Sequence, residues 1–291
     1  MPYPMSNPMY RMMTVLYNKM ALKRQFFHID MNTKSLLEQS YFITSFISGF
    51  YIASSSCLAV YSTGRTTGLA VDIGHTQSNF TPVFEGFPLF LHPCHLTSPL
   101  CGEDIDNVLR KRNPALIDLS AADLKEVKSK NCKVFPTFGE ACDAILAAES
   151  QEKLFTLPDG REVKLGREVE TVPEMLFSPH SYGIKSPGLH EMIYNSAVRV
   201  ELDVQDDMFR NIVVFGGTAD IPGMKERIEN ELVGSCNASV KVIMENGNGN
   251  TIAWQGGSIL AALSTFENQW AFRVQYEEDG PSTTVKRNFN S

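Results

Sequence analysis

One stretch, running from Asn211 to Leu232 as NIVVFGGTADIPGMKERIENEL, constrains the fold more than any other part of this sequence. It opens with an unbroken apolar run, Ile212 to Phe215, which is typical of a strand covered on both faces. Gly216-Gly217-Thr218 end the run, and the apolar spacing that follows predicts a helix, with Pro222 suited to its first turn. Free backbone N–H groups at such a glycine turn can meet a ligand closely. A tight turn without a ligand is the simpler alternative.

The same order of features returns near the end of the chain. Ile252-Ala253-Trp254 leads to a second glycine pair, Gly256-Gly257, and the apolar spacing from Ser258 predicts another helix. Two units of strand, glycine pair and helix predict sheets covered by helices, with a ligand cleft at the glycine ends of the strands.

Two hairpins are also predicted. Gly68–Asp72 and Ser78–Glu85 read as two strands joined by a short turn. Lys153–Gly166 reads as two alternating runs around Pro158-Asp159-Gly160, a sequence whose turn chemistry needs no tertiary help.

The N-terminal part raises a membrane alternative. Helical spacing predicts helices over Met12–Leu22 and Lys34–Phe50, and no charged residue occurs from Gln39 to Gly64. A buried helix running into a buried strand explains this stretch as well as a bilayer span does, and we favour the buried elements. The first residues lack an apolar core of signal-peptide length, so we expect neither secretion nor a membrane span.

Composition narrows the class of protein. With 291 residues, 43% of them hydrophobic and 20% charged, the chain is typical of a soluble globular protein. The net charge of -7, without any basic block, argues against nucleic acid as a partner. Six cysteines occur without a CxxC pair, which predicts reduced thiols in the cytosol or nucleus and excludes zinc ribbons.

Two places carry residues that bind metals in other proteins. Asp72 ends a predicted strand beside a glycine turn, where a carboxylate can hold a divalent cation or a phosphate-bound water. Alternatively, Asp72 accepts hydrogen bonds from its own turn. His92, Cys94 and His95 have no fourth ligand nearby and lie in a proline-broken loop, so we do not expect a metal centre there.

Several segments together resemble actin. The region of its second phosphate loop is matched by Ser62–Gly68, Val71–Gly74 and Phe84–Leu89. Its adenosine loop is matched by Phe215–Thr218 with Pro222-Gly223. Its C-terminal subdomain is matched by Trp254, Gly256–Ala261 and Leu263–Phe266. The resemblance runs in register from about Phe50 to Phe289 and more loosely before that. On these residues the chain is identified as a member of the actin and actin-related family.

This resemblance implies the α/β fold of the actin-like ATPases, with two lobes built on ribonuclease H-like sheets covered by helices. The first strands of subdomain 1, the first phosphate loop with its lysine, and subdomain 2 with its mobile loop have no counterpart here. We therefore expect residues 1–62 and 252–291 to form a partial subdomain 1, residues 63–98 and 185–251 to form subdomain 3, and residues 99–184 to form a reduced subdomain 4.

The family binds ATP or ADP with Mg²⁺, and the resemblance carries eight positions of that site over to this chain. They are Asp72, which would also hold the metal through water, and Gly74, Gly102, Lys125, Glu126, Gly216, Gly217 and Thr218. His75 stands where the family has an aspartate, Ser55 where it has the glutamine that orients the attacking water, and Asn79 where it has the assisting histidine. Because phosphoryl transfer depends on positioning and charge neutralisation, these changes predict weak nucleotide binding and lost hydrolysis.

The resemblance also implies protein partners. Six positions match the lining of the groove in which actin receives apolar helices: Tyr61, Gly64, Thr66, Leu260, Leu263 and Phe266. These residues alternatively pack the subdomain junction only. We expect a structural or adaptor subunit that docks on actin, actin-related or other cytoskeletal subunits, in the cytoplasm and cytoskeleton or alternatively in the nucleus. An ATP-binding switch with slow or no hydrolysis, and a shortened actin-like isoform with an exposed sheet edge, are the alternatives.

Overall fold

The computed structural model divides the chain into two compact units. Unit 1 comprises residues 1–62 and 253–291, and unit 2 comprises residues 63–252. The described residues are 49–51, 53–90, 92–146, 153–157, 159–236, 239–244, 249, 251–269, 271–272, 274 and 277–278. The predicted helix Met12–Leu22 and nearly all of Lys34–Phe50 lie outside them. The finer division into subdomains stays a prediction.

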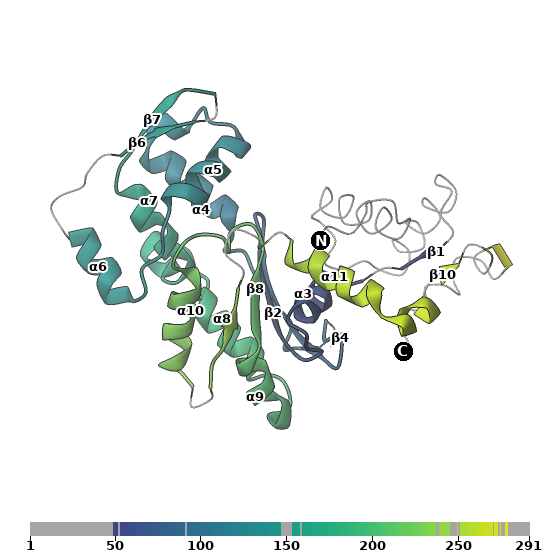
Figure 1. Ribbon diagram of the computed structural model, residues 1–291. Coiled ribbons are helices and arrows are strands. Elements are labelled where there is room, and N and C mark those ends of the chain that lie inside the picture. Colours follow the sequence, from purple (N-terminus) through teal and green to yellow (C-terminus); the bar gives the residue numbers. More distant parts are fainter. Residues whose placement is uncertain are drawn as a thin grey trace. The chain divides into compact units, whose positions relative to one another are not determined.

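A mixed sheet forms the centre of unit 2. Its strands are β2 (Gly68–Ile73), β3 (Ser78–Phe84), β4 (Phe87–Pro88), β5 (Leu96–Ser98), β8 (Ile212–Phe215) and β9 (Val242–Ile243). They lie in the order β4-β3-β2-β8-β9, with β5 also paired to β3. β8 is parallel to β2 and to β9, whereas β3 is antiparallel to β2 (Figure 1). All four residues of β8 are buried, as its apolar run predicts.

The predicted hairpin of β2 and β3 is confirmed, with Gly68 opposite Val83 and Ile73 opposite Ser78. The next turn, from β3 to β4, passes through Glu85 and Gly86, whose φ angles are 50° and 88°. Two consecutive left-handed residues are typical of the tight turns whose twist matches that of paired strands.

Three helices pack beside the sheet. They are α8 (Leu189–Ala197), α9 (Leu202–Arg210) and α10 (Met224–Val233), which contact β3, β2 and β9 respectively. The prediction that Pro222 begins the helix after β8 is wrong, because α10 begins only at Met224. Gly223 precedes it with a φ of 85°, and a Cβ there would lie 2.0 Å from the carbonyl oxygen of Val134. A left-handed φ is not helical, so the helix cannot include Gly223.

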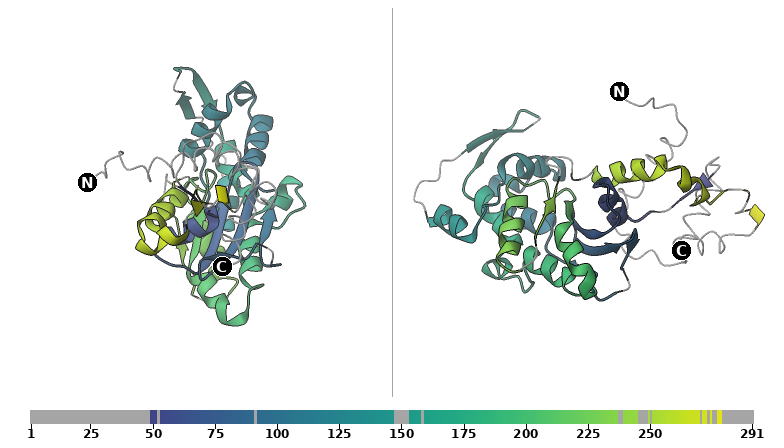
Figure 2. Two further views of the ribbon diagram at one scale, coloured as in Figure 1. Left: turned by 90° about the vertical axis from the view of Figure 1, so that its right-hand side faces the viewer. Right: turned by 60° about the horizontal axis from the view of Figure 1, so that its bottom comes forward.

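The rest of unit 2 is mostly short helices, with a hairpin at its edge (Figures 1 and 2). The helices are α4 (Gly102–Arg112), η1 (Pro114–Leu116), α5 (Ala121–Asn131), α6 (Phe138–Leu146), α7 (Glu168–Thr171), η2 (Val172–Leu176) and η3 (Pro179–Tyr182). The hairpin, β6 (Lys153–Thr156) with β7 (Glu162–Leu165), is the one predicted from the sequence, although Pro158 of its turn lies outside the described residues.

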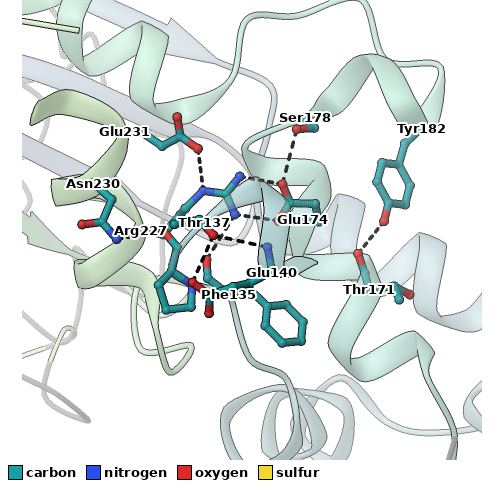
Figure 3. A network of polar contacts seen from close by, with 11 residues as sticks. Phe135, Thr137, Glu140, Thr171, Glu174, Ser178, Tyr182, Arg227, Asn230 and Glu231 are labelled. Carbon is teal, nitrogen blue, oxygen red and sulfur yellow. Dashed lines mark hydrogen bonds and ion pairs between the residues drawn. The ribbon is translucent and has the colours of Figure 1, made fainter. Parts of the chain in front are cut away.

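A polar network ties α10 to η2 and to the loop before α6 (Figure 3). At its centre Arg227 contacts Glu174 and Glu231, and it also donates to the backbone carbonyl of Phe135. Beside it, Asn230 donates to the carbonyl of Pro136.

Unit 1 contains α3 (Ser55–Ser62), α11 (Ile252–Ala262), η4 (Ser264–Gln269) and the strand pair β1 (Gly49–Phe50) with β10 (Ala271–Phe272). Three predictions are wrong here. Gly49 and Phe50 form a strand and not a helix end, the apolar residues up to Tyr61 form a helix and not a strand, and Gly256-Gly257 lie inside α11. No helix among the described residues is long and apolar enough to cross a membrane.

The second glycine pair has a packing reason. A Cβ on Gly256 would lie 1.6 Å from the carbonyl oxygen of Leu58 in α3, so only glycine lets the two helix backbones approach this closely. A glycine pair after apolar residues therefore occurs in two different structures in this chain. Gly216-Gly217 lie in the loop after β8, and Gly256-Gly257 lie inside α11.

Candidate functional site

The ends of β2 and β8 meet at one edge of the sheet in unit 2. The two strands are parallel and Asp72 lies in register with Phe215, so the loops that follow them are neighbours. Thr218 joins the loops, because its N–H donates to the carbonyl of Ile73 (3.1 Å) and its hydroxyl donates to the carbonyl of Gly74 (2.8 Å).

The start of α4 completes this junction. The N–H of Gly102 donates to the carbonyl of Gly74 (3.1 Å), and the N–H of Glu103 donates to the carbonyl of His75 (2.7 Å). Six of the eight predicted nucleotide residues thus lie at one place: Asp72, Gly74, Gly102, Gly216, Gly217 and Thr218. Whether they contact a nucleotide stays a prediction.

The glycines of the junction are required by the protein's own contacts. A Cβ would lie 2.7 Å from the carbonyl oxygen of Gln77 at Gly74, 2.4 Å from the hydroxyl of Thr218 at Gly102, and 2.5 Å from the carbonyl oxygen of Ile73 at Gly216. Gly216 also has a φ of 105°, which other residues rarely adopt. These glycines therefore let the loops lock together before any ligand is considered.

The junction still offers donors to an anion. Among the described residues, the backbone N–H groups of Thr76 and Gly217 have no acceptor, whereas those of Gly74, Gly102 and Gly216 donate within the protein. Backbone N–H groups without an internal acceptor on neighbouring loops can donate to a phosphate oxygen.

Two predicted residues lie apart from the junction. Lys125 is exposed on α5, and Glu126 pairs with Lys130 one turn further along the same helix. No hydrogen bond or ion pair of the described residues joins either side chain to the strand-end loops.

Lys128 and Asp106 form a buried ion pair at the junction that the sequence did not predict. The Nζ atom of Lys128 on α5 lies 2.6 Å from Oδ1 of Asp106 on α4 and 3.0 Å from the carbonyl oxygen of Gly102. His75 Nδ1 lies 3.9 Å from the other carboxylate oxygen of Asp106. A lysine-rich helix ordinarily has its charges in water, but Lys128 is buried, like Val127 before it and Leu124 one turn earlier.

The surroundings of this pair are apolar enough to affect a neighbouring thiol. Burial raises the pKa of Cys132 to about 12, although the nearby ammonium of Lys128 acts in the opposite direction. A charged group in such surroundings needs a partner, which explains the short contact between Lys128 and Asp106.

Asn79 occupies the position directly across the sheet from Asp72. Its side chain is buried, and its carbonyl oxygen accepts a hydrogen bond from Nε2 of Gln77 (3.3 Å). A carboxamide neither gains nor loses a proton near neutral pH, so this position cannot supply a general base. Ser55, the other position predicted to have lost a catalytic group, begins α3 in unit 1.

A loop near residue 249 also reaches the junction. The N–H of Gly216 donates to the carbonyl of Gly249 (3.1 Å), and the N–H of Gly249 donates to the carboxylate of Asp220 (3.0 Å). Gly249 is therefore held by the loop after β8.

The junction offers few carboxylate ligands for Mg²⁺. Magnesium prefers carboxylate oxygens and water. Of the carboxylates at the junction, Asp106 is already paired with Lys128, and an imidazole lies beside it. Asp72 remains the predicted water-mediated contact for a cation, and the described residues contain no cluster of three or more His, Cys, Asp or Glu side chains that could hold a metal.

His92, Cys94 and His95 do not form such a cluster either. His95 Nδ1 lies 3.2 Å from the hydroxyl of Thr81, and its ring packs edge-on against Phe90. Cys94 is buried, and its carbonyl accepts a hydrogen bond from Ser196 (2.6 Å). The side chains of Cys94 and His95 thus have structural roles.

The six predicted groove residues belong to different units. Tyr61, Leu260, Leu263 and Phe266 lie in unit 1, and Gly64 and Thr66 lie, exposed, in unit 2. Leu263, just after α11, is 51% exposed, whereas Phe266 is only 3% exposed and packs edge-on against Tyr51. Leu263 is thus available to a partner, and Phe266 supports the fold of its own unit.

Comparison with known proteins places this geometry in context. The family model described as Actin matches residues 27–115 and 121–290. A Dictyostelium discoideum protein named putative actin-29 is 30% identical over 249 residues, which cover 82% of this chain and 64% of that protein. A Bos taurus protein named actin-like protein 9 is 34% identical over 257 residues, which cover 81% of this chain and 58% of that protein. The chain therefore spans about three fifths of the length of these relatives.

Proposed function

We propose, from the premise that this chain belongs to the actin family, that it is a structural or adaptor subunit of a protein assembly and does not hydrolyse ATP. Membership of this family implies protein partners and, as a rule, a nucleotide with Mg²⁺. The partners proposed for this chain are actin, actin-related proteins or other cytoskeletal subunits. Its proposed place is the cytoplasm and cytoskeleton, with the nucleus as the alternative.

The observation that carries this proposal is Asn79 opposite Asp72. The resemblance aligns Asn79 with the histidine that assists water attack in actin, and the side chain here is a buried amide engaged by Gln77. An amide cannot accept the proton of an attacking water, so the step that depends most on positioning and proton removal loses a participant. We therefore propose that this chain functions by binding other proteins through its surface and not by hydrolysing ATP.

The partner surface is proposed to include Leu263. Half of its side chain is exposed, and it directly follows α11, the helix that packs against α3. Exposed leucine next to a rigid helix suits the apolar face of a partner helix.

Two measurements test the adaptor proposal. Purified chain should show no ATP turnover above background and no filaments by sedimentation, but it should bind monomeric actin in a titration. Leu263→Asp should weaken that binding about tenfold or more, because a charge replaces an apolar contact, whereas Val233→Asp on the exposed end of α10 should leave it unchanged. Turnover at the rate of filament-forming actins, or filaments without a partner, would contradict the proposal.

A second candidate is an ATP-binding switch with slow or no hydrolysis. Its support is the junction itself, where Asp72, Gly74 and Thr218 lie together on neighbouring loops. Equilibrium binding of labelled ATP tests it. Saturable binding that is lost in Asp72→Ala would support the switch, and no binding at millimolar nucleotide would remove it.

A further inference from the structure

The hairpin of β6 and β7 is a two-stranded sheet of its own in unit 2 (Figure 1). Thr156 lies opposite Glu162, and the next pair toward the turn is joined by a hydrogen bond from the N–H of Leu157 to the carbonyl of Arg161 (2.8 Å). Bonded and non-bonded pairs alternate along antiparallel strands. The backbone groups of Leu154 and Thr156 are therefore directed away from β7, at the outer edge of β6.

The two edges of this hairpin differ. On β7, the outward carbonyl of Lys164, the residue opposite Leu154, accepts a hydrogen bond from the side chain of Asn113 (2.8 Å). On β6, no described residue outside the hairpin forms a hydrogen bond with the backbone of Leu154 or Thr156. Such an edge is able to pair with a further extended chain.

The two faces of the hairpin differ as well. Leu157, Val163 and Leu165 are buried on the face that packs against unit 2. Leu154 is on the other face, because side chains alternate along a strand, and it is 58% exposed. A strand added along β6 would bring its own side chains beside Leu154, where an apolar residue would be partly removed from water.

Three lysines border β6 on its packed face: Lys130, Lys133 and Lys153. Their side chains are 45% to 60% exposed. The ammonium of Lys130 lies 5.9 Å from the centre of the Phe155 ring and pairs with Glu126. Lys133 and Lys153 share one carboxylate, that of Glu170, at 3.1 and 3.7 Å. Three exposed cations thus have two acidic partners, which leaves positive charge beside the edge.

This charge distinguishes between possible occupants of the edge. A second copy of the chain that paired through its own β6 would bring the same lysines together, and lysine on an edge strand is a common means of preventing such pairing. An acidic chain would be attracted instead, because opposite charges across neighbouring strands are stabilising.

We propose that the outer edge of β6 binds an extended acidic segment of a partner protein as a third strand. The acidic residues of this segment lie toward Lys130, Lys133 and Lys153, and the apolar residues between them contact Leu154. This inference goes beyond the proposed function, because the surface belongs to unit 2 and involves neither a nucleotide nor Leu263.

The first experiment uses a fluorescein-labelled peptide of about six residues that alternates glutamate and valine. The full chain is titrated into it, with fluorescence anisotropy as the readout, and a peptide that alternates lysine and valine is the control. We expect saturable binding of the glutamate peptide and binding of the lysine peptide that is at least about tenfold weaker. No saturable binding at millimolar chain, or equal binding of both peptides, would overturn the proposal.

Hydrogen exchange followed by NMR identifies the backbone groups involved. In the free chain the N–H groups of Leu154 and Thr156 should exchange rapidly, whereas that of Leu157 is protected by its bond to Arg161. The glutamate peptide should protect at least one of the two outward groups. Binding that protects neither of them would refute pairing at this edge.

Thr156→Pro tests the edge with little change to the hairpin. The outward N–H at this position is not needed by β7, but proline removes it as a donor and places a ring at the edge. Binding of the glutamate peptide should weaken about tenfold or more. Thr156→Val keeps the N–H and the branched side chain, so it is the matched control and should bind like the wild type. Circular dichroism checks that both variants fold.

A charge reversal tests the lysines. Lys153→Glu should weaken binding of the glutamate peptide about threefold or more, whereas the same change at the exposed Lys185, after η3, should leave it unchanged. Equal effects of the two substitutions would mean that overall charge, and not the edge of β6, attracts the peptide.

The remaining outcomes separate this inference from the alternatives. A wild-type dimer in sedimentation that Thr156→Pro dissociates would show that a second copy occupies the edge, and it would overturn the proposal. Leu263→Asp should leave peptide binding unchanged while it weakens binding of actin. The edge of β6 and the proposed adaptor role can therefore fail independently of each other.

Discussion

The guanidinium of Arg227 and the carboxylate of Glu174 face each other inside unit 2 with two parallel hydrogen bonds. The Arg227 nitrogens lie 2.8 and 2.7 Å from the two carboxylate oxygens, and the side chains are 1% and 5% exposed (Figure 3). The guanidinium also lies over the ring of Phe177, 4.7 Å from its centre. A planar fork that matches a carboxylate is the geometry in which arginine is hardest to replace.

Arg227→Met is expected to destabilise the protein strongly. The methionine fills part of the space but leaves Glu174 as a buried carboxylate without its cation, and breaking a buried pair in this way costs about 3–5 kcal/mol. The free energy of unfolding from urea titration, followed by circular dichroism, measures the loss.

The control is an exposed arginine in a comparable pair. Arg210 lies 3.6 Å from Asp206 on α9, and both side chains are more than half exposed. Arg210→Met should therefore change the free energy of unfolding by less than about 1 kcal/mol. If the Arg227 and Arg210 variants lose the same stability, the buried pair does not have the role described here.

Gly256→Ala is expected to disrupt the packing of α11 on α3. A Cβ at this position would lie 1.6 Å from the Leu58 carbonyl oxygen, which belongs to backbone and cannot rotate away. Separating the two helices should cost about 1–3 kcal/mol or more. Trp254 on the same helix reports the change through its fluorescence during urea unfolding.

Gly234→Ala at the end of α10 provides the matched control. Its φ is -69° and the nearest atoms to a new Cβ lie at 3.7 Å, so alanine fits without strain. This variant should be neutral or more stable by about 0.4–1 kcal/mol, because alanine restricts the unfolded chain. An equal loss of stability at both glycines would mean that the contact with Leu58 is not what selects glycine at 256.

The sequence predicted those parts of the fold in which local pattern and tertiary surroundings agree. The apolar run Ile212–Phe215 is a buried central strand, and the runs around Asp72 and within Lys153–Gly166 are hairpins, since each pattern is satisfied by its nearest neighbours. Gly256-Gly257 shows the opposite case. The letters repeat the pattern of Gly216-Gly217, but the glycine is selected by a helix nearly two hundred residues away in sequence.

In the candidate site, too, contacts between residues distant in sequence were the ones that the sequence did not predict. Asp72, Gly74, Gly216 and Thr218 could be placed together because parallel strands end at the same edge. Lys128 could not, because a lysine-rich helix ordinarily has all its charges in water. Helical spacing from Leu124 puts Lys128 on the buried side of α5, but its acidic partner Asp106 comes from another helix, α4, and the sequence does not indicate this pairing.

Thiol reactivity is expected to separate the cysteines into two groups. Burial raises the pKa of Cys57 and of Cys132 to about 12 and that of Cys101 to about 11, and it also raises the pKa of Cys94, so these four buried thiols stay protonated at pH 8. Cys142 and Cys236 are only partly buried. An aromatic disulfide reagent should label these two in the folded protein, as peptide mass spectrometry would show.

The same reagent in urea provides the reference, because all six cysteines are free thiols and should then react. Rapid labelling of Cys132 in the folded protein would show that α5 opens easily, and it would contradict the tight junction described around Lys128.

Stability is expected to fall as the pH is lowered through the range in which histidine titrates, and His190 is one cause. Burial lowers its pKa below the ordinary value of 6.5, and this outweighs the opposite effect of Glu231 and Glu191. In the folded chain the ring stacks on Phe177, with 6.0 Å between ring centres. Below about pH 6.5 the unfolded chain therefore binds a proton that the folded chain resists, so the contribution is complete above that pH and is lost as the pH falls through the lower, folded value.

His190→Gln isolates this contribution, because glutamine does not titrate and all other groups are common to both proteins. The difference in free energy of unfolding between wild type and variant should be constant above about pH 7 and should shift in favour of the variant toward pH 5. Urea titrations at several pH values measure it. Parallel curves across this range would mean that the His190 ring accepts its proton as readily in the folded chain as in the unfolded one, and hence that the packing against Phe177 does not exclude water from it.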